Sequence, residues 1–197
     1  MKMLTSLLIT ALYTVFVQNL VLSSGLGMSE AIRVSTKPGT FGKIALTISG
    51  FSVATSAICS LLNTVSVVAG FSFAGKAAVY GLVLAGVYLI VATVMKLVFR
   101  VSDKQLGTMG IAALNTLVFA IPFINSSAAY TFANSIGSGI GAGIAFILAA
   151  ALISKGSQAI SANKDVPQIF QGTPSLLIYV GLLSLAFAGF TDSTLFS

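Results

Sequence analysis

Two asparagines, Asn19 and Asn115, stand inside apolar sequence and have similar surroundings. Asn19 is followed by Leu-Val-Leu and then by Ser-Ser-Gly-Leu-Gly, whereas Asn115 is followed by Thr-Leu-Val-Phe and later by a proline. An amide without a hydrogen-bond partner costs several kcal/mol in hydrocarbon, so polar groups in such segments are usually buried in protein or functional. The repeat, at about half the chain length, predicts two related halves that meet at a shared polar site.

The same two asparagines predict helices that are broken near the middle of a membrane. We expect Gly25 and Gly27 to end one helix and Pro122 to interrupt the other. The asparagine amides would then satisfy the backbone groups that each break leaves open. The alternative is an interhelical hydrogen bond that only holds the bundle together.

The composition places these segments in a membrane. Hydrophobic residues make up 56% of the chain and charged residues 7%, whereas a soluble domain carries about 25% charged residues. Such a chain cannot cover a water-facing surface, so we predict an all-α integral membrane protein. The basic residues lie singly in short connections and form no stripe that could follow phosphates, so no nucleic-acid partner is expected.

Residue types exclude several kinds of chemistry. The chain has no histidine, and Cys59 is its one cysteine. Histidine catalysis, histidine metal ligation, an intrachain disulfide and a cysteine-only zinc or iron–sulfur site within one chain are therefore excluded. We interpret Cys59 as a small buried residue. The acids lie at span ends or in loops, which argues against a self-sufficient ion pump; they are Glu30, Asp103, Asp165 and Asp192.

Six apolar stretches are long enough, or nearly so, to cross a bilayer of about 30 Å. They cover residues 3–22, 43–62, 78–98, 106–123, 132–153 and 175–190. We interpret the first as a span and not as a cleaved signal peptide, because Ser23-Ser24-Gly25 is a poor cleavage site.

These spans predict a single transmembrane domain over residues 1–197, with repeat halves of about 1–100 and 101–197. Each half holds three spans, an odd number, so the halves run through the membrane in opposite directions. A second matching pair supports the repeat, since the segment from Tyr80 in span three resembles the segment from Tyr179 in span six. The expected architecture is two inverted three-helix repeats, with spans one and four broken.

Charges in the connections predict the orientation. Eight basic residues lie in connections one, three and five, and two lie on the opposite side. The positive-inside rule makes the first group cytoplasmic and places both termini outside. The eight are Arg33, Lys37, Lys43, Lys96, Arg100, Lys104, Lys155 and Lys164, and the two are Lys2 and Lys76.

Four glycines at the start of span five predict close helix packing; they are Gly137, Gly139, Gly141 and Gly143. The segment contains a G-x-G-x-x-A pattern, as in dinucleotide-binding loops. No soluble strand precedes it, however, and the run continues into a membrane span. We therefore expect packing through glycines four residues apart, and span five is a candidate face for a partner.

The C-terminal third resembles the end of the RnfA/NqrE family. The resemblance rests on residues 165–172 (DVPQIFQG) and 183–190 (LSLAFAGF), and residues 19–22 and 57–59 fit the early spans of the family. Its members are membrane subunits of the Rnf and Na⁺-translocating NADH:quinone oxidoreductase complexes. The resemblance implies a multi-pass subunit of an ion-translocating electron transport complex in a bacterial or archaeal inner membrane, surrounded by lipid and other subunits.

In that family, two half-membrane helices each bring one cysteine to the middle of the membrane. A sister subunit of opposite orientation, RnfE/NqrD-like, brings two more, and the four hold a [2Fe–2S] cluster. Counted from Asn19 and Asn115, the two positions fall on Ser29 and Thr116. Alcohols stay protonated at neutral pH and lack the soft sulfur donor. We therefore expect no cofactor in this chain, and a mid-membrane polar site of Asn19, Ser29, Asn115 and Thr116.

Three functions remain open. The leading hypothesis is a subunit of an Rnf/Nqr-like complex that is packed against an opposite-orientation homologue. Any enzymatic role would be that of a non-catalytic subunit of a redox-driven ion translocase. The second hypothesis is a transporter or channel subunit whose small cavity is lined by the polar site. The third is a structural membrane anchor for peripheral partners.

Overall fold

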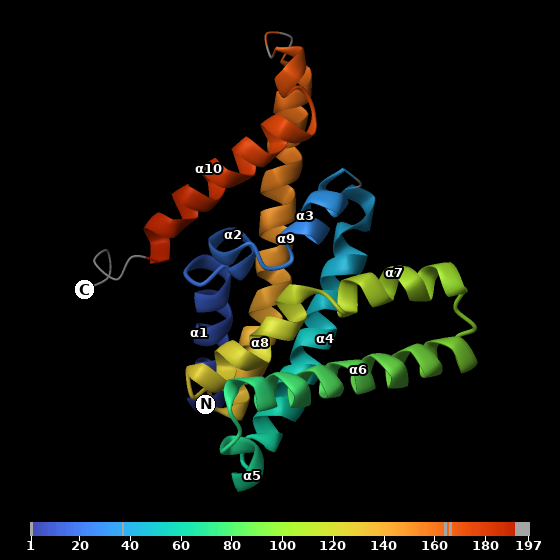
Figure 1. Ribbon diagram of the computed structural model, residues 1–197, viewed down its shortest axis with the longest axis vertical. Coiled ribbons are helices and arrows are strands. Elements are labelled where there is room, and N and C mark those ends of the chain that lie inside the picture. Colours follow the sequence, from blue (N-terminus) through green and yellow to red (C-terminus); the bar gives the residue numbers. More distant parts are fainter. Residues whose placement is uncertain (1, 37, 164, 166, 192–197) are drawn as a thin grey trace.

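The computed structural model describes the chain except residues 1, 37, 164, 166 and 192–197 (Figure 1). Lys37, Lys164 and Asp192, which entered the analysis of charges, therefore lie outside the described residues. The described elements are all helical: α1 (Lys2–Phe16), α2 (Leu20–Ser24), α3 (Met28–Ser35), η1 (Pro38–Thr40), α4 (Phe41–Leu62), α5 (Ser66–Ala69), α6 (Phe73–Leu97), α7 (Asp103–Ala113), α8 (Thr116–Ser127), α9 (Phe132–Ala162), η2 (Gln168–Phe170) and α10 (Thr173–Thr191).

Four helical stretches are apolar and long enough to cross a membrane. Among the described residues they are Phe41–Leu62, Phe73–Leu97, Asp103–Ser127 and Phe132–Ala162, and they match predicted spans two to five. The stretches predicted as spans one and six contain shorter apolar helices, Lys2–Phe16 and Thr173–Gly189. The prediction of an all-α membrane protein is confirmed, while six spans in two inverted repeats stay a prediction.

The longest helix, α9, stands at the centre of the molecule (Figure 1). Its 31 residues span about 46 Å at 1.5 Å per residue, and its most extensive contacts are with α4 and α1. Thr131 caps its first turn by accepting a hydrogen bond from the backbone N–H of Asn134 at 3.3 Å. Apolar side chains such as Phe146 and Ile153 are fully buried along it, so α9 anchors the core.

The glycine run of span five, residues 137–143, packs inside the chain. Its first and third glycines face α1, and its second and fourth face α4. A Cβ at Gly141 would lie 2.7 Å from the carbonyl oxygen of Ala11, and one at Gly139 would lie 2.8 Å from the backbone nitrogen of Val53. Residues four apart share a helix face, so α9 is closely packed on two sides. Span five therefore does not offer these glycines to a partner.

The order of elements repeats along the chain. An interrupted stretch (α1–α3), a long central helix (α4) and a projecting helix (α6) are followed by a second interrupted stretch (α7–α8), a central helix (α9) and a projecting helix (α10). Helices α6 and α10 extend from the central pair toward opposite sides (Figure 1). This arrangement brings the two interrupted stretches against the same core.

Candidate functional site

Asn19 closes the first interruption of the first stretch. Helix α1 ends at Phe16 and α2 begins at Leu20. The side-chain Oδ1 of Asn19 accepts a hydrogen bond from the backbone N–H of Leu22 at 3.3 Å, and its Nδ2 donates to the carbonyl oxygen of Val15 at 3.1 Å. The residue is 1% exposed. The Nδ2 thus satisfies a carbonyl that the break would leave open, and the Oδ1 is a second acceptor for the Leu22 N–H, which also donates to the backbone carbonyl of Asn19 at 3.0 Å.

Gly25 and Gly27 form the second interruption of this stretch. Helix α2 ends at Ser24, α3 begins at Met28, and the two glycines have φ angles of +69° and +75°. A residue with a Cβ is strained in this left-handed region. The glycines therefore allow the chain to turn tightly between two short helices, at the place that the sequence predicted.

Asn115 marks the interruption of the second stretch. Helix α7 ends at Ala113 and α8 begins at Thr116. The Oδ1 of Asn115 accepts a hydrogen bond from the backbone N–H of Leu117 at 2.6 Å. Its Nδ2 is buried and has no hydrogen-bond partner among the described residues. One end of this amide caps α8, and the other is left unused.

Pro122 does not interrupt span four as expected. It lies inside α8, which continues from Thr116 to Ser127. A proline within a helix removes one backbone hydrogen bond and crowds the preceding turn, and a membrane helix can tolerate this when its neighbours pack around it. Pro122 is buried, and α8 packs against α4 and α9. The break lies instead where Asn115 supplies a cap.

The two interrupted stretches meet. The backbone N–H of Gly27 donates to the Oγ1 of Thr116 at 3.0 Å, across 89 positions of sequence. A Cβ at Gly27 would lie 3.1 Å from the Cβ of Leu117 and 3.4 Å from both polar atoms of the Asn115 amide. We call this contact of Gly27 with Asn115, Thr116 and Leu117 the junction. Because α3 and α8 both begin here, their N-terminal ends give the junction a positive potential.

The predicted polar site is brought together in part. Asn115 and Thr116 lie at the junction, and Ser29 is exposed in the first turn of α3, two residues after Gly27. Asn19 uses both ends of its amide within its own stretch. It therefore caps a break and does not supply a polar atom to the junction.

An ion pair between a buried carboxylate and an exposed arginine lies near the junction and was missed in the sequence. Glu30, in the first turn of α3, is 4% exposed. Its carboxylate accepts hydrogen bonds from Nε and Nη2 of Arg33, at 2.7 and 2.5 Å. The available signal was the spacing, since residues three apart lie on one face of a helix. The acid that looked like a loop charge is thus buried one turn from Gly27.

The donors at the junction do not fit an iron–sulfur cluster. Ser29 and Thr116 carry alcohols, and the Thr116 hydroxyl accepts the hydrogen bond from Gly27. Iron–sulfur clusters are held chiefly by deprotonated thiols. Cys59 is buried on α4 and lines a separate cavity. The junction is suited to hydrogen bonding between the two halves, not to holding soft metal ions.

Comparisons with known proteins agree on one kind of protein, a membrane subunit of an oxidoreductase complex. A family model described as Rnf-Nqr subunit, membrane protein, matches residues 7–193. The chain is 32% identical to a subunit of the ion-translocating oxidoreductase complex of Hahella chejuensis, over 95% of this chain and 97% of the relative. It is 27% identical to a subunit of the Na(+)-translocating ferredoxin:NAD(+) oxidoreductase complex of Acetobacterium woodii, over 96% and 99%.

Proposed function

We propose that this chain, which belongs to the Rnf-Nqr family of membrane subunits, is a membrane subunit of an ion-translocating electron transport complex. The observation that carries the proposal is the match along nearly the whole chain, to relatives that are themselves named as subunits of ion-translocating oxidoreductase complexes. The relatives are matched over almost their full length. Its all-helical, multi-pass fold agrees with this role.

Within the complex, this subunit contributes no ligand to a [2Fe–2S] cluster. The support is donor chemistry: Ser29 and Thr116 are alcohols at the two positions where the family pattern has cysteines, and alcohols are poor ligands for such clusters. Electrons then pass through other subunits or another cofactor. Stoichiometric iron and sulfide in anaerobically purified chain, lost on Ser29→Ala, would contradict this proposal.

A second membrane subunit of opposite orientation covers the junction. Ser29 and Thr116, whose side chains end in hydroxyls, are exposed there. Polar groups that face lipid are costly, so protein is the better cover. Helix α6 adds an apolar face beside them, with Leu82 74% and Ile90 67% exposed. The internal glycines of α9 move the expected interface away from span five and onto these surfaces.

Purification from the native membrane tests the complex. A tagged chain, extracted in mild detergent, should bring down a homologous membrane protein with the reverse charge bias in its loops, together with flavin- or iron-bearing subunits. Mass spectrometry identifies the proteins, and visible and EPR spectra identify their cofactors. A stable, colourless monomer at native expression would overturn the proposal and favour a transporter.

Cysteine labelling tests the orientation, which we propose to have both termini outside an inner membrane. In a Cys59→Ser background, an impermeant thiol reagent applied from outside should label a cysteine placed at Lys76 and spare one at Lys104. These residues lie in the first turns of α6 and α7, at ends of opposite predicted side. The reverse labelling pattern would refute the orientation. It would not bear on the proposal that the chain is a subunit of a complex.

A further inference from the structure

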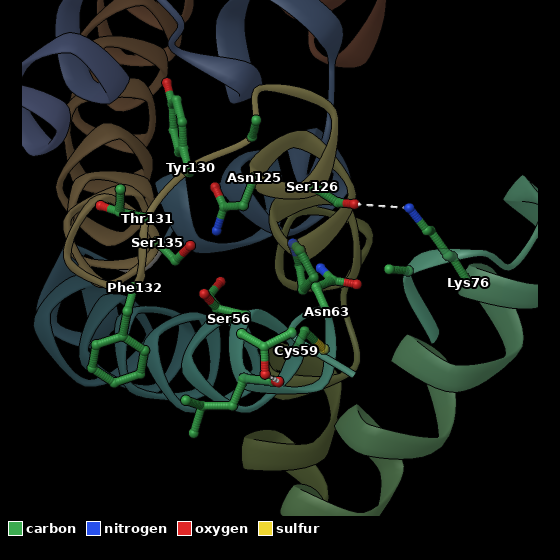
Figure 2. Close-up of a pocket in the computed structure, with 16 residues that line it drawn as sticks. Ser56, Cys59, Asn63, Lys76, Asn125, Ser126, Tyr130, Thr131, Phe132 and Ser135 are labelled. Carbon is green, nitrogen blue, oxygen red and sulfur yellow. Dashed lines mark hydrogen bonds between the residues drawn. The ribbon is translucent and has the colours of Figure 1, made fainter. Parts of the chain in front are cut away.

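A polar cavity of about 390 Å³ lies at the end of the bundle where α4, α6, α8 and α9 come together. Ser56, Asn125 and Ser135 enter it from α4, α8 and α9, and Figure 2 shows their polar ends around one shared space. These residues are 1%, 5% and 1% exposed. This site is separate from the junction and from the proposed function.

Polar atoms of this cavity have unused hydrogen-bonding capacity. The Oγ of Ser56, the Oγ of Ser135, and both Oδ1 and Nδ2 of Asn125 have no partner within the described residues. Buried polar groups in native proteins are almost always hydrogen-bonded. Three such residues on three different helices, around one cavity, indicate that the cavity holds a polar occupant.

The charge of the cavity selects the kind of occupant. Lys76 lines it from α6, and its Nζ donates to the Oγ of Ser126 at 3.3 Å (Figure 2). No carboxylate is among the described lining residues. Burial, with the neighbouring Tyr13, raises the pKa of Tyr130, so this lining phenol also stays uncharged. A lone ammonium repels cations, and an anion compensates it.

We propose that this cavity binds an oxyanion, with the ammonium of Lys76 as its counter-charge. The amide N–H groups of Asn125 and the hydroxyls of Ser56 and Ser135 donate hydrogen bonds to the oxyanion oxygens. Charge-assisted hydrogen bonds of this kind are shorter and stronger than neutral ones. The anion is a free phosphate or carboxylate, or the phosphate of a lipid headgroup, since the cavity lies beside the ends of membrane-spanning helices.

Binding of inorganic phosphate tests the site directly. The purified full-length chain in detergent is dialysed against labelled phosphate, with chloride holding the ionic strength constant. We expect saturable binding of one phosphate per chain, weakened at least about tenfold by Lys76→Met and largely restored by Lys76→Arg. Lys104→Met is the matched control, because Lys104 is exposed on α7 and should leave binding unchanged.

Cys59 supplies a second readout, because this single cysteine lines the same cavity. It is 1% exposed, so a thiol reagent reaches it when the chain opens, and an occupant of the cavity should oppose that opening. Phosphate should slow its alkylation by a neutral maleimide in the wild type and in Lys104→Met, but not in Lys76→Met. Asn125→Leu, checked for folding by size exclusion, should lose the protection as well. Equal effects of phosphate and chloride on both readouts would show that the cavity does not select a soluble oxyanion.

Nanodiscs separate the two sources of the oxyanion. Native mass spectrometry compares the chain from discs of phosphatidylcholine alone with the chain from discs that also contain phosphatidylglycerol. Retention of phosphatidylglycerol by the wild type and not by Lys76→Met, without phosphate binding, identifies a headgroup site. Phosphate binding without retained lipid identifies a soluble anion. If the wild type binds neither phosphate nor phosphatidylglycerol, or if Lys76→Met behaves like the wild type, the proposal is overturned.

Discussion

The two interruptions use the same residue in different ways. Asn19 is buried and spends both ends of its amide on backbone groups of its own stretch. Asn115 is half-buried, caps α8 with its oxygen, and leaves its nitrogen unpaired among the described residues, beside Gly27 of the other stretch. The comparison teaches that a repeated residue need not have a repeated role: the first cap is self-contained, and the second stands where the halves meet.

The two helices that begin at the junction also differ in whether the group at their N-terminal end is bound within its own stretch or by the other one. Helix α8 starts with a side-chain cap from its own stretch, Asn115. Helix α3 starts at Met28 and has Gly27 at its N-cap position, where no side chain can cap it, and the N–H of Gly27 donates to Thr116 of the other half. The first half therefore depends on the second for one of its helix ends. The following substitutions test this asymmetry.

Asn19→Ala should have the largest effect. It leaves the carbonyl of Val15 without its partner in the core and removes one of two acceptors of the Leu22 N–H, which keeps the backbone carbonyl of residue 19, so we expect a loss of about 1–3 kcal/mol. The measurement is thermal unfolding followed by a thiol-reactive dye, since Cys59 is 1% exposed and reacts when the chain opens. Asn115→Ala is the paired variant; equal losses at both positions would remove the comparison.

Gly27→Ala should have the second-largest effect on stability. Both Gly25 and Gly27 have positive φ, so alanine costs about 1–2 kcal/mol in strain at either position. At Gly27 the new Cβ would also lie 3.1 Å from the Cβ of Leu117, whereas at Gly25 no described atom lies within 4 Å. We expect Gly27→Ala to lower the unfolding midpoint more than Gly25→Ala. The reverse order would mean that the stretches are not in contact.

Thr116→Val should have a smaller effect, of about 1 kcal/mol, because it removes one acceptor and keeps the shape of the side chain. Thr116→Ser retains the hydroxyl and serves as its control. If the valine and serine variants unfold at the same temperature, the hydrogen bond from Gly27 does not contribute to stability. Hydrogen exchange at the Gly27 amide, which should quicken in Thr116→Val alone, gives an independent measurement.

Asn115→Ser should have the smallest effect, below about 0.5 kcal/mol, because serine is as good a cap as asparagine. The same exchange at Asn19 also removes the donor to Val15 and should cost more. This pair isolates the role of the amide nitrogen. A loss in Asn115→Ser as large as that in Asn19→Ser would show that the amide nitrogen of Asn115 also contributes to stability.

The sequence predicted the elements that depend on local chemistry. Asparagine caps and left-handed glycines act within a few residues, so Asn19, Asn115, Gly25 and Gly27 could be placed at breaks from their neighbours alone. Pro122 failed the same reasoning, because whether a helix continues through a proline depends on what packs around it. Six spans and inverted halves stay predictions.

The features that were missed depend on contacts between distant segments. Glu30 looked like a loop acid, but α3 folds back onto α9 and buries its carboxylate, which forms an ion pair with the exposed Arg33. The cavity residues Ser56, Asn125 and Ser135 come from three helices that no local pattern connects. Small-residue spacing predicted that the glycine run would pack closely, but not that both of its neighbours belong to this chain.

The close packing of α9 against α1 on one side and α4 on the other limits which parts of the molecule can move. Its glycines place the backbones of α1 and α4 too close for α9 to rotate or to slide by a turn, because close-packed interiors transmit strain and do not deform smoothly. These three helices form a rigid frame. We expect rearrangements during the working cycle of a complex to involve α6, α7 and α10, which project from that frame and contact it less extensively than its three helices contact one another.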